Sequence, residues 1–171
     1  MNGYNYRKKI TIDKNKVAVA VLSPNKDLVD FPVLIELEDD DLKHVNGYCG
    51  NKIQNIGGKD ISFALSTDPT VPLSFQLEAY NPESGKITCW VKIPSLSAWG
   101  TASLPTSVYL YYGSTVLHEP YSPKSLNTWS ADYTRVWHMN QDNLPAESIN
   151  AQSNVLEQSL IGSSGISSSH Y

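Results

Sequence analysis

Two carboxylates are the first residues of this sequence whose positions could support chemistry. Asp60 follows two glycines and a lysine and opens a run of alternating apolar residues, and Glu78 lies between two apolar residues of a later run. A glycosidase requires paired carboxylates about 5–10 Å apart across a cleft, a distance that sequence spacing does not give. The structural alternative is that Asp60 caps a turn through backbone hydrogen bonds and that Glu78 pairs across the sheet with a lysine such as Lys92.

Aromatic side chains form a second candidate site. Successive side chains of a strand point to opposite faces, so the aromatic residues Tyr80, Trp90, Tyr109 and Tyr111 are expected opposite the apolar stripe of each run. If their strands are neighbours, they form a row on one outer face. Sugars stack their C–H patches on such rings while nearby polar groups bind the hydroxyls, so the pattern predicts carbohydrate binding. The alternative is that this face packs against the other sheet, a neighbouring domain or a long loop.

Trp99 is a further candidate for stacking on a ligand, because Gly100 follows it in a long irregular segment. Loops of this length within a compact domain are often functional. The alternative is that the indole plugs one end of the hydrophobic core.

The acidic run 38–41 (EDDD) suggests calcium, because hard cations take several carboxylate oxygens. Its spacing lacks the Asp-x-Asp-x-Asp-Gly loop pattern, and adjacent acids of an extended chain alternate in direction. A solvated strand end is the alternative interpretation, and we expect no cofactor other than a calcium ion that the sequence leaves open.

Nucleophilic catalysis has no support in the sequence. There is no Gly-x-Ser-x-Gly motif, and Cys89 lies in the middle of an apolar strand pattern, where thiols are usually inert. Cys49 lies in a segment rich in glycine and asparagine, so the two cysteines are either one disulfide or one buried and one loop thiol. We therefore expect a protein that is not an enzyme.

Alternating apolar residues define the elements that must position these side chains. Seven short runs are strand candidates: six have the period of two that is typical of strands with one buried face, and 17–22 is mostly apolar. A Pro- and Gly-containing turn joins two of them at 81–85. Together they predict an all-β fold, an antiparallel two-sheet β-sandwich of jelly-roll-like type with long loops. The runs are 6–12, 17–22, 31–37, 60–65, 73–80, 86–93 and 107–112.

Length and charge limit the domain organisation and the partners. The 171 residues carry a formal net charge of −4, which gives no electrostatic basis for binding nucleic acid. No apolar run approaches the roughly 20 residues of a membrane helix, so we expect no membrane insertion. The strand pattern places a β-sandwich module in residues 1–116, and the Pro-containing stretch after it reads as a linker over 117–134.

Five motifs, taken in order, resemble one family, the domain of unknown function 2341 of secreted and surface proteins, over residues 4–116. Family members often precede a concanavalin-A-like lectin/glucanase (laminin-G-like) domain, and 135–139 (RVWHM) resembles the opening strand of one. Residues 135–171 are therefore expected to be the truncated start of a second, lectin-like domain. Ser62 is a departure, because the family usually has a basic residue there. The motifs are 30–35 (DFPVLI), 57–63 (GGKDISF), 73–78 (LSFQLE), 89–94 (CWVKIP) and 108–113 (VYLYYG).

The resemblance implies a secreted or cell-surface location and adjacent domains of the same chain as partners. With the aromatic pattern, it leads us to expect a non-enzymatic binding or adhesion module for a polysaccharide or cell-surface glycan. The alternatives are a structural spacer that orients the adjacent lectin-like domain, and an accessory module of a polysaccharide-degrading enzyme.

Overall fold

The computed structural model describes residues 3–18, 26–114, 127–129, 133, 136–138 and 146–148. The chain divides into two compact units, residues 1–130 and 131–171. The described elements of the first unit are six strands and two 3₁₀ turns: β1 (Tyr4–Thr11), η1 (Lys14–Lys16), β2 (Leu28–Glu38), η2 (Asp40–Leu42), β3 (Ile61–Leu65), β4 (Phe75–Asn81), β5 (Lys86–Leu96) and β6 (Ser107–Ser114). In the second unit, β7 (Val136–His138) pairs antiparallel with β8 (Ala146–Ser148).

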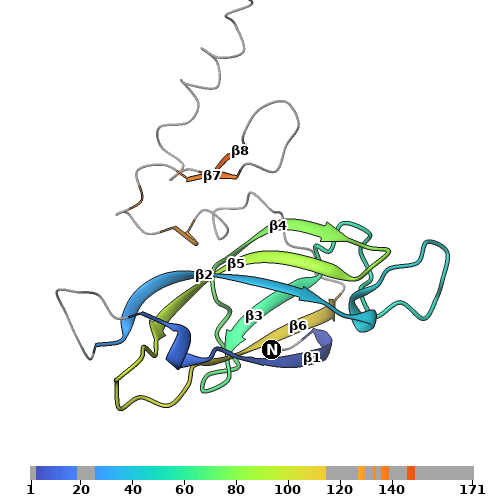
Figure 1. Ribbon diagram of the computed structural model, residues 1–171. Helices are drawn as coiled ribbons and strands as arrows, with labels where there is room; N and C mark the ends of the chain where they lie inside the picture. The colour runs from blue at the N-terminus through green and yellow to red at the C-terminus, as the bar shows by residue number, and fades with distance from the viewer. Residues whose placement is uncertain are drawn as a thin grey trace, which may run out of the picture. The chain divides into compact units, whose positions relative to one another are not determined.

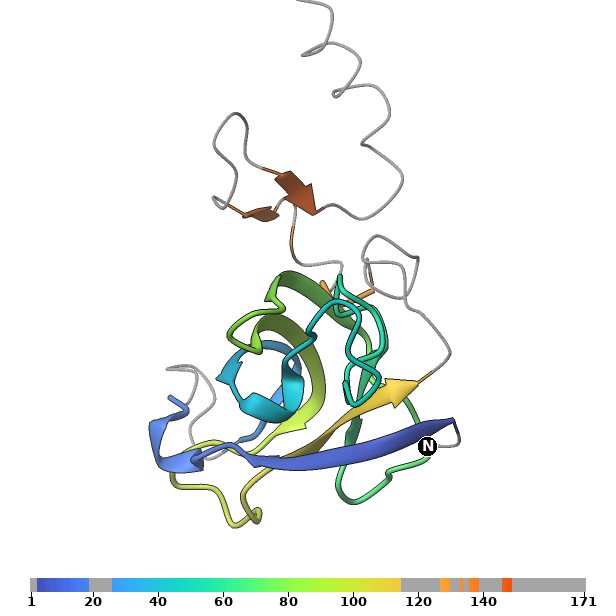
Figure 2. The same ribbon diagram turned by 90° about the vertical axis from the view of Figure 1, so that its right-hand side faces the viewer.

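The strands of the first unit form two antiparallel three-stranded sheets that pack face to face (Figure 1). Sheet A has the order β1-β6-β3, and sheet B has the order β2-β5-β4. The view turned by 90° shows the two sheets as separate layers, one above the other (Figure 2). The predicted all-β class and two-sheet antiparallel sandwich are therefore confirmed.

Six of the seven predicted runs lie in these strands. In the seventh, the run 17–22, Val17 and Ala18 belong to no strand, and the remaining four residues lie outside the described part of the chain. The predicted turn joins β4 to β5: Asn81 accepts hydrogen bonds through its side-chain oxygen from the backbone N–H groups of Glu83 and Ser84, at 2.9 and 3.2 Å.

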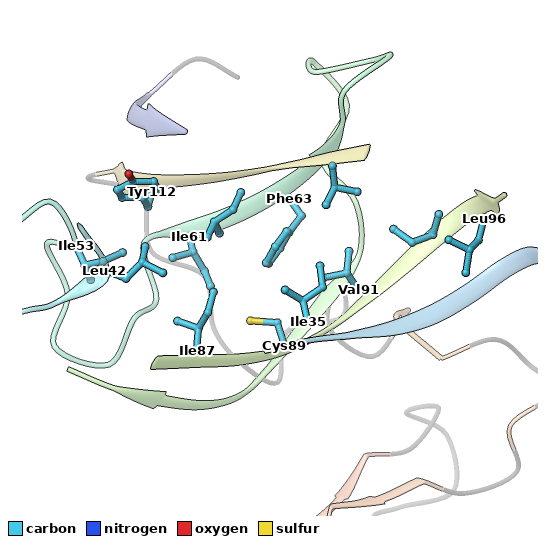
Figure 3. Packing of buried hydrophobic residues seen from close by; sticks show 13 residues of the cluster. Ile35, Leu42, Ile53, Ile61, Phe63, Ile87, Cys89, Val91, Leu96 and Tyr112 are labelled. Carbon is cyan, nitrogen blue, oxygen red and sulfur yellow. The ribbon is translucent and has the colours of Figure 1, made fainter. Parts of the chain in front are cut away.

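The core lies between the two sheets, and β5 and β6 are the central strands of each layer. Every second residue of β5 from Ile87 to Ile93 is fully buried, and these side chains face those of β3 and β6 (Figure 3). Leu42 and Ile53 close one end of this core near Tyr112 (Figure 3). The alternation seen in the sequence therefore corresponds directly to the burial of one face of each sheet.

The β4–β5 turn packs closely against the start of η2 at this end of the core. Two glycines with positive φ, one in this contact and one outside it, allow the contact to be tested. Gly85 has φ +71°, and a Cβ atom there would lie 2.1 Å from the Asp39 carbonyl oxygen. Gly47 has φ +77°, but a Cβ atom there would meet nothing within 4 Å.

We expect Gly85→Ala to destabilise the protein by at least 2 kcal/mol more than Gly47→Ala. Both variants carry the cost of a left-handed residue, about 1–2 kcal/mol, but only the first forces two backbone segments apart. Denaturant unfolding of both variants measures the difference, and equal losses would contradict the close packing of η2 on the β4–β5 turn.

Candidate functional site

The sheet topology separates the aromatic residues that were expected to form one row. Trp90 belongs to β5 of sheet B, whereas Tyr109 and Tyr111 belong to β6 of sheet A. All three alternate with core residues of their own strand, so they lie on the outer faces of different sheets. The condition for a single row, that the strands be neighbours, is therefore not met: β5 pairs with β4 in sheet B, whereas β6 belongs to sheet A.

Tyr80 lies on the inner side of sheet B, not on the outer face as predicted. The register of β4 against β5 shifts between Leu77, which pairs with Cys89, and Ala79, which pairs with Thr88. This β-bulge reverses the alternation, so Tyr80 packs against the core and its hydroxyl donates to the Leu42 carbonyl at 2.6 Å. Burial, and then the charge of Asp60, raise the pKa of Tyr80 to about 12.

Trp90 is covered by another tryptophan from the segment after β6. The ring centroids of Trp90 and Trp129 are 5.1 Å apart, with an interplanar angle of 52°. The Trp129 indole N–H donates to the side-chain oxygen of Gln76 at 2.8 Å, and these two side chains are 5% and 4% exposed. Trp129 was not among the predicted site residues, because it lies in the predicted linker, outside the strand pattern.

The two candidate carboxylates have structural contacts of their own. Glu78, at the bulge, accepts the indole N–H of Trp90 at 2.5 Å. Asp60 is fully buried, and its carboxylate accepts the backbone N–H groups of Gln54 and Asn55 at 2.7 and 3.1 Å. These contacts give Asp60 the turn-capping role of the structural alternative, while Glu78 orients the ring that Trp129 covers.

The outer face of sheet A carries a group of residues that we call the tyrosine cluster: Tyr4, Arg7, Tyr109 and Tyr111. The Tyr111 ring lies 5.9 Å from the rings of both Tyr4 and Tyr109, and the Arg7 guanidinium lies 4.6 Å from the centroid of Tyr109. A pocket of about 320 Å³ opens beside the cluster and is lined by Tyr4, Asn5, Tyr6, Arg7, Pro69 and Tyr111.

Neighbouring residues hold the tyrosine cluster in place. Tyr111 is only 4% exposed, and its hydroxyl donates to the Pro69 carbonyl at 3.5 Å. Burial raises the pKa of Tyr4, whose hydroxyl also hydrogen-bonds to buried Ser62. Tyr4 and Arg7 were not among the predicted site residues. They join the cluster because β1 pairs with β6, which places Arg7 opposite Tyr111.

Trp99 is exposed at one end of the sandwich. Its side chain is 60% exposed, while its backbone N–H donates to the Val17 carbonyl at 3.0 Å. The indole therefore does not plug the core. Val29 and Leu104 are exposed hydrophobic residues as well.

Lysines neutralise the acidic run that suggested calcium. Lys8 of β1 forms ion pairs with Asp39 and Asp41 at 2.6 and 3.2 Å, and Lys52 pairs with Asp41 at 2.7 Å. Hydrogen bonds from Lys8 and Lys52 are the main causes that lower the pKa values of Asp39 and Asp41, respectively. Within the described residues, no three His, Cys, Asp or Glu side chains are grouped so that they could hold a metal ion.

The two cysteines are free thiols. Cys89 is fully buried in the core, and this burial raises the pKa of its thiol, whereas Cys49 is exposed. Of the two interpretations of the cysteines, the pair of unbridged thiols is therefore the one observed.

The fold defines a class, the antiparallel β-sandwich, and one family model matches part of the chain. The family is described as Domain of unknown function (DUF2341), and the match covers residues 57–137, a little under half of the sequence. No curated protein and no solved structure matches the chain. Among the described residues, no helix is long and apolar enough to cross a membrane.

The family match confirms the first part of the resemblance. It includes the last four of the five motifs, and it extends through the segment that contains Trp129. The motif at 30–35 precedes the matched segment. The start of a concanavalin-A-like domain at 135–171 stays a prediction, and most of these residues lie outside the described part of the chain.

We expect Lys8→Met to lower the free energy of unfolding by about 1 kcal/mol at pH 7, because partly buried Asp39 loses its cation and Asp41 keeps only Lys52. The folded-state pKa values of these carboxylates lie below the ordinary value, so the contribution exists above about pH 4 and is lost as pH falls through the folded values. Urea unfolding at pH 7 and pH 3 should show the variant and the original protein converging at the lower pH.

Lys43→Met is the matched control for this charge pair. Lys43 binds Asp40 at 2.6 Å, but the Asp40 side chain is 90% exposed, so we expect no measurable loss. A loss at Lys43 as large as that at Lys8 would contradict the structural importance of the Lys8 contacts.

Thiol labelling should distinguish the two cysteines. We expect a thiol reagent such as Ellman's reagent to modify Cys49 alone in the folded protein and both cysteines in guanidinium chloride, because burial hides Cys89 and disfavours its thiolate. Cys49→Ser should abolish the reaction of the folded protein. Rapid labelling of that variant would show that Cys89 is accessible.

Proposed function

We propose that this β-sandwich is a non-enzymatic module of a secreted or cell-surface protein, and that it positions the chain that follows it. The observation that carries the proposal is the burial of Trp129 on sheet B. The resemblance to DUF2341, found in secreted and surface proteins, supports the location.

The contacts of Trp129 combine the features of a specific anchor. The indole packs on Trp90, which Glu78 orients, and its single N–H donor is used by Gln76. A buried aromatic pair contributes about 0.5–1.5 kcal/mol beyond the burial of its area, and the hydrogen bond restricts the ring to one orientation. Thr128, next to Trp129, is also fully buried. The segment 127–129 is therefore held against the sandwich by directional as well as apolar contacts.

An anchor at this position restricts the point from which the chain leaves the sandwich. A connection that starts at this anchor is shorter than one that starts at the end of β6, and shorter links restrict the relative placement of what they join. This is the role of a spacer, and it requires no catalytic group.

Carbohydrate binding or adhesion is the second candidate function. The covering of Trp90 disfavours a glycan site on the outer face of sheet B. The tyrosine cluster on sheet A favours one there, because it combines aromatic rings and a guanidinium beside a pocket.

We expect Trp129→Ala to lower the free energy of unfolding by about 3 kcal/mol, the usual cost of removing a buried aromatic side chain. Trp99→Ala is the matched control, since that indole is largely exposed and its loss should change stability by no more than about 0.5 kcal/mol. Denaturant unfolding of both variants tests the anchor.

Positioning itself can be tested by spin-label distance measurements between Cys49 and a cysteine introduced by Ala131→Cys. We expect a narrow distance distribution that broadens in the Trp129→Ala background and stays narrow in the Trp99→Ala background. A distribution that is equally broad with and without Trp129 would refute the spacer function.

A further inference from the structure

We propose that the tyrosine cluster and its pocket bind an acidic sugar chain, with the carboxylate of a uronic acid residue on Arg7. The inference rests on the second candidate function, carbohydrate binding on sheet A, and is independent of the spacer function, because the anchor lies on sheet B. It replaces the expected row of four aromatics by a smaller site with a different composition.

Three tyrosines line the pocket: Tyr4 and Tyr111 of the cluster, and Tyr6. The Tyr4 and Tyr111 rings are inclined by 57°, and the Tyr109 and Tyr111 rings by 68°. Tyr111 is buried and forms the base, whereas Tyr6, at the pocket wall, is 40% exposed. Rings at such angles suit the axial C–H patches of a pyranose, which contacts aromatic side chains by its faces and edges.

The size and polarity of the pocket agree with a short stretch of sugar. Its volume of about 320 Å³ is at the lower end of the range for small-ligand sites, roughly 300–1,000 Å³. Tyrosine hydroxyls, the Asn5 amide and the Arg7 guanidinium provide polar groups at its wall. Asn5 itself is held by a hydrogen bond from its amide nitrogen to the Gly113 carbonyl at 2.9 Å.

Arg7 gives the site its preference for an anion. Its guanidinium carbon lies over the Tyr109 ring, 4.6 Å from the centroid. A planar guanidinium matches a carboxylate with two parallel hydrogen bonds. Among the described residues, Arg7 is exposed and forms no ion pair, so a ligand carboxylate would not have to displace a protein one.

Arg7 is the charged side chain of the pocket lining. None of its six described lining residues is acidic. Lys9 lies two residues after Arg7 on β1 and therefore on the same face of sheet A. Two acids lie nearby: Asp60, whose charge acts on Tyr4, is buried and bound to two backbone N–H groups, and exposed Asp68, next to the lining residue Pro69, accepts a hydrogen bond from the Thr70 hydroxyl at 2.8 Å. Two cations on a protein of net charge −4 suit a chain with one carboxylate per sugar better than the denser phosphates of nucleic acid.

The test measures the affinity of the full 171-residue chain for oligogalacturonate by isothermal titration calorimetry at low salt. The matched neutral ligand is the methyl-esterified form of the same oligosaccharide, which retains the sugar rings and lacks the charge. We expect binding of the acidic form and binding of the esterified form that is at least tenfold weaker. A sulfated, carboxylate-free polysaccharide in a parallel titration distinguishes sulfate from carboxylate as the anion.

Three variants connect the binding to the site. Arg7→Gln should weaken binding at least tenfold, and Arg7→Lys should restore it only in part, because the charge returns without the planar pair of donors. Lys86→Gln on sheet B, where Lys86 pairs with Glu36, is the control and should bind as the original protein does. Arg7 is exposed, so unchanged thermal unfolding should show that its variants fold.

Binding that depends on Arg7 and on the carboxylate supports the proposal. Equal affinity for the acidic and esterified ligands, binding of the sulfated polysaccharide alone, binding insensitive to Arg7→Gln, or no binding of oligogalacturonate would each overturn it. None of these results alters the tests of Trp129, so failure here is distinguishable from failure of the spacer function.

Discussion

Burial of the two inner sheet faces is the constraint on which the rest of this structure depends. The central strands β5 and β6 place every second side chain into the space between the layers, where Ile87, Cys89 and Val91 meet Phe63 and Leu110 without access to water. Close packing leaves no room there for a ligand or for a pair of ionised carboxylates. Any recognition by the first unit must therefore use the outer faces, the loops or the ends of the sandwich.

The outer faces of the two sheets differ in the side chains they carry and in what covers them. On sheet B, the bulge at Glu78 reverses the alternation of β4 and leaves Gln76 and Trp90 as the contacts of Trp129. On sheet A, the pairing of β1 with β6 places Arg7 beside the tyrosines of β6. One face is thus used by the chain itself, while the other presents aromatic rings and positive charge beside a pocket.

Ionic contacts at one end join the two layers. Lys8 extends from β1 of sheet A to Asp39, which caps η2 directly after β2 of sheet B. Tyr112 of β6 donates its hydroxyl to Asp41 at 3.4 Å, and burial together with this acid raises the pKa of Tyr112 to about 12. The acidic run that had suggested a cation site therefore binds the cations of the protein's own lysines.

Local sequence determined the strands, the β4–β5 turn and the two-layer class, because alternation and turn residues are properties of a few neighbouring positions. It also identified Asp60 as a residue that could cap a turn. Only the tertiary structure decided which strands are neighbours, and so placed Trp90 and Tyr109 on different faces. The local pattern also did not predict the bulge that turns Tyr80 inward. Nor did it predict the contact of Trp129 with Gln76, which lies 53 residues away in the sequence. Strand pairing and long-range packing depend on the free energy of the whole core, which no short stretch of sequence contains.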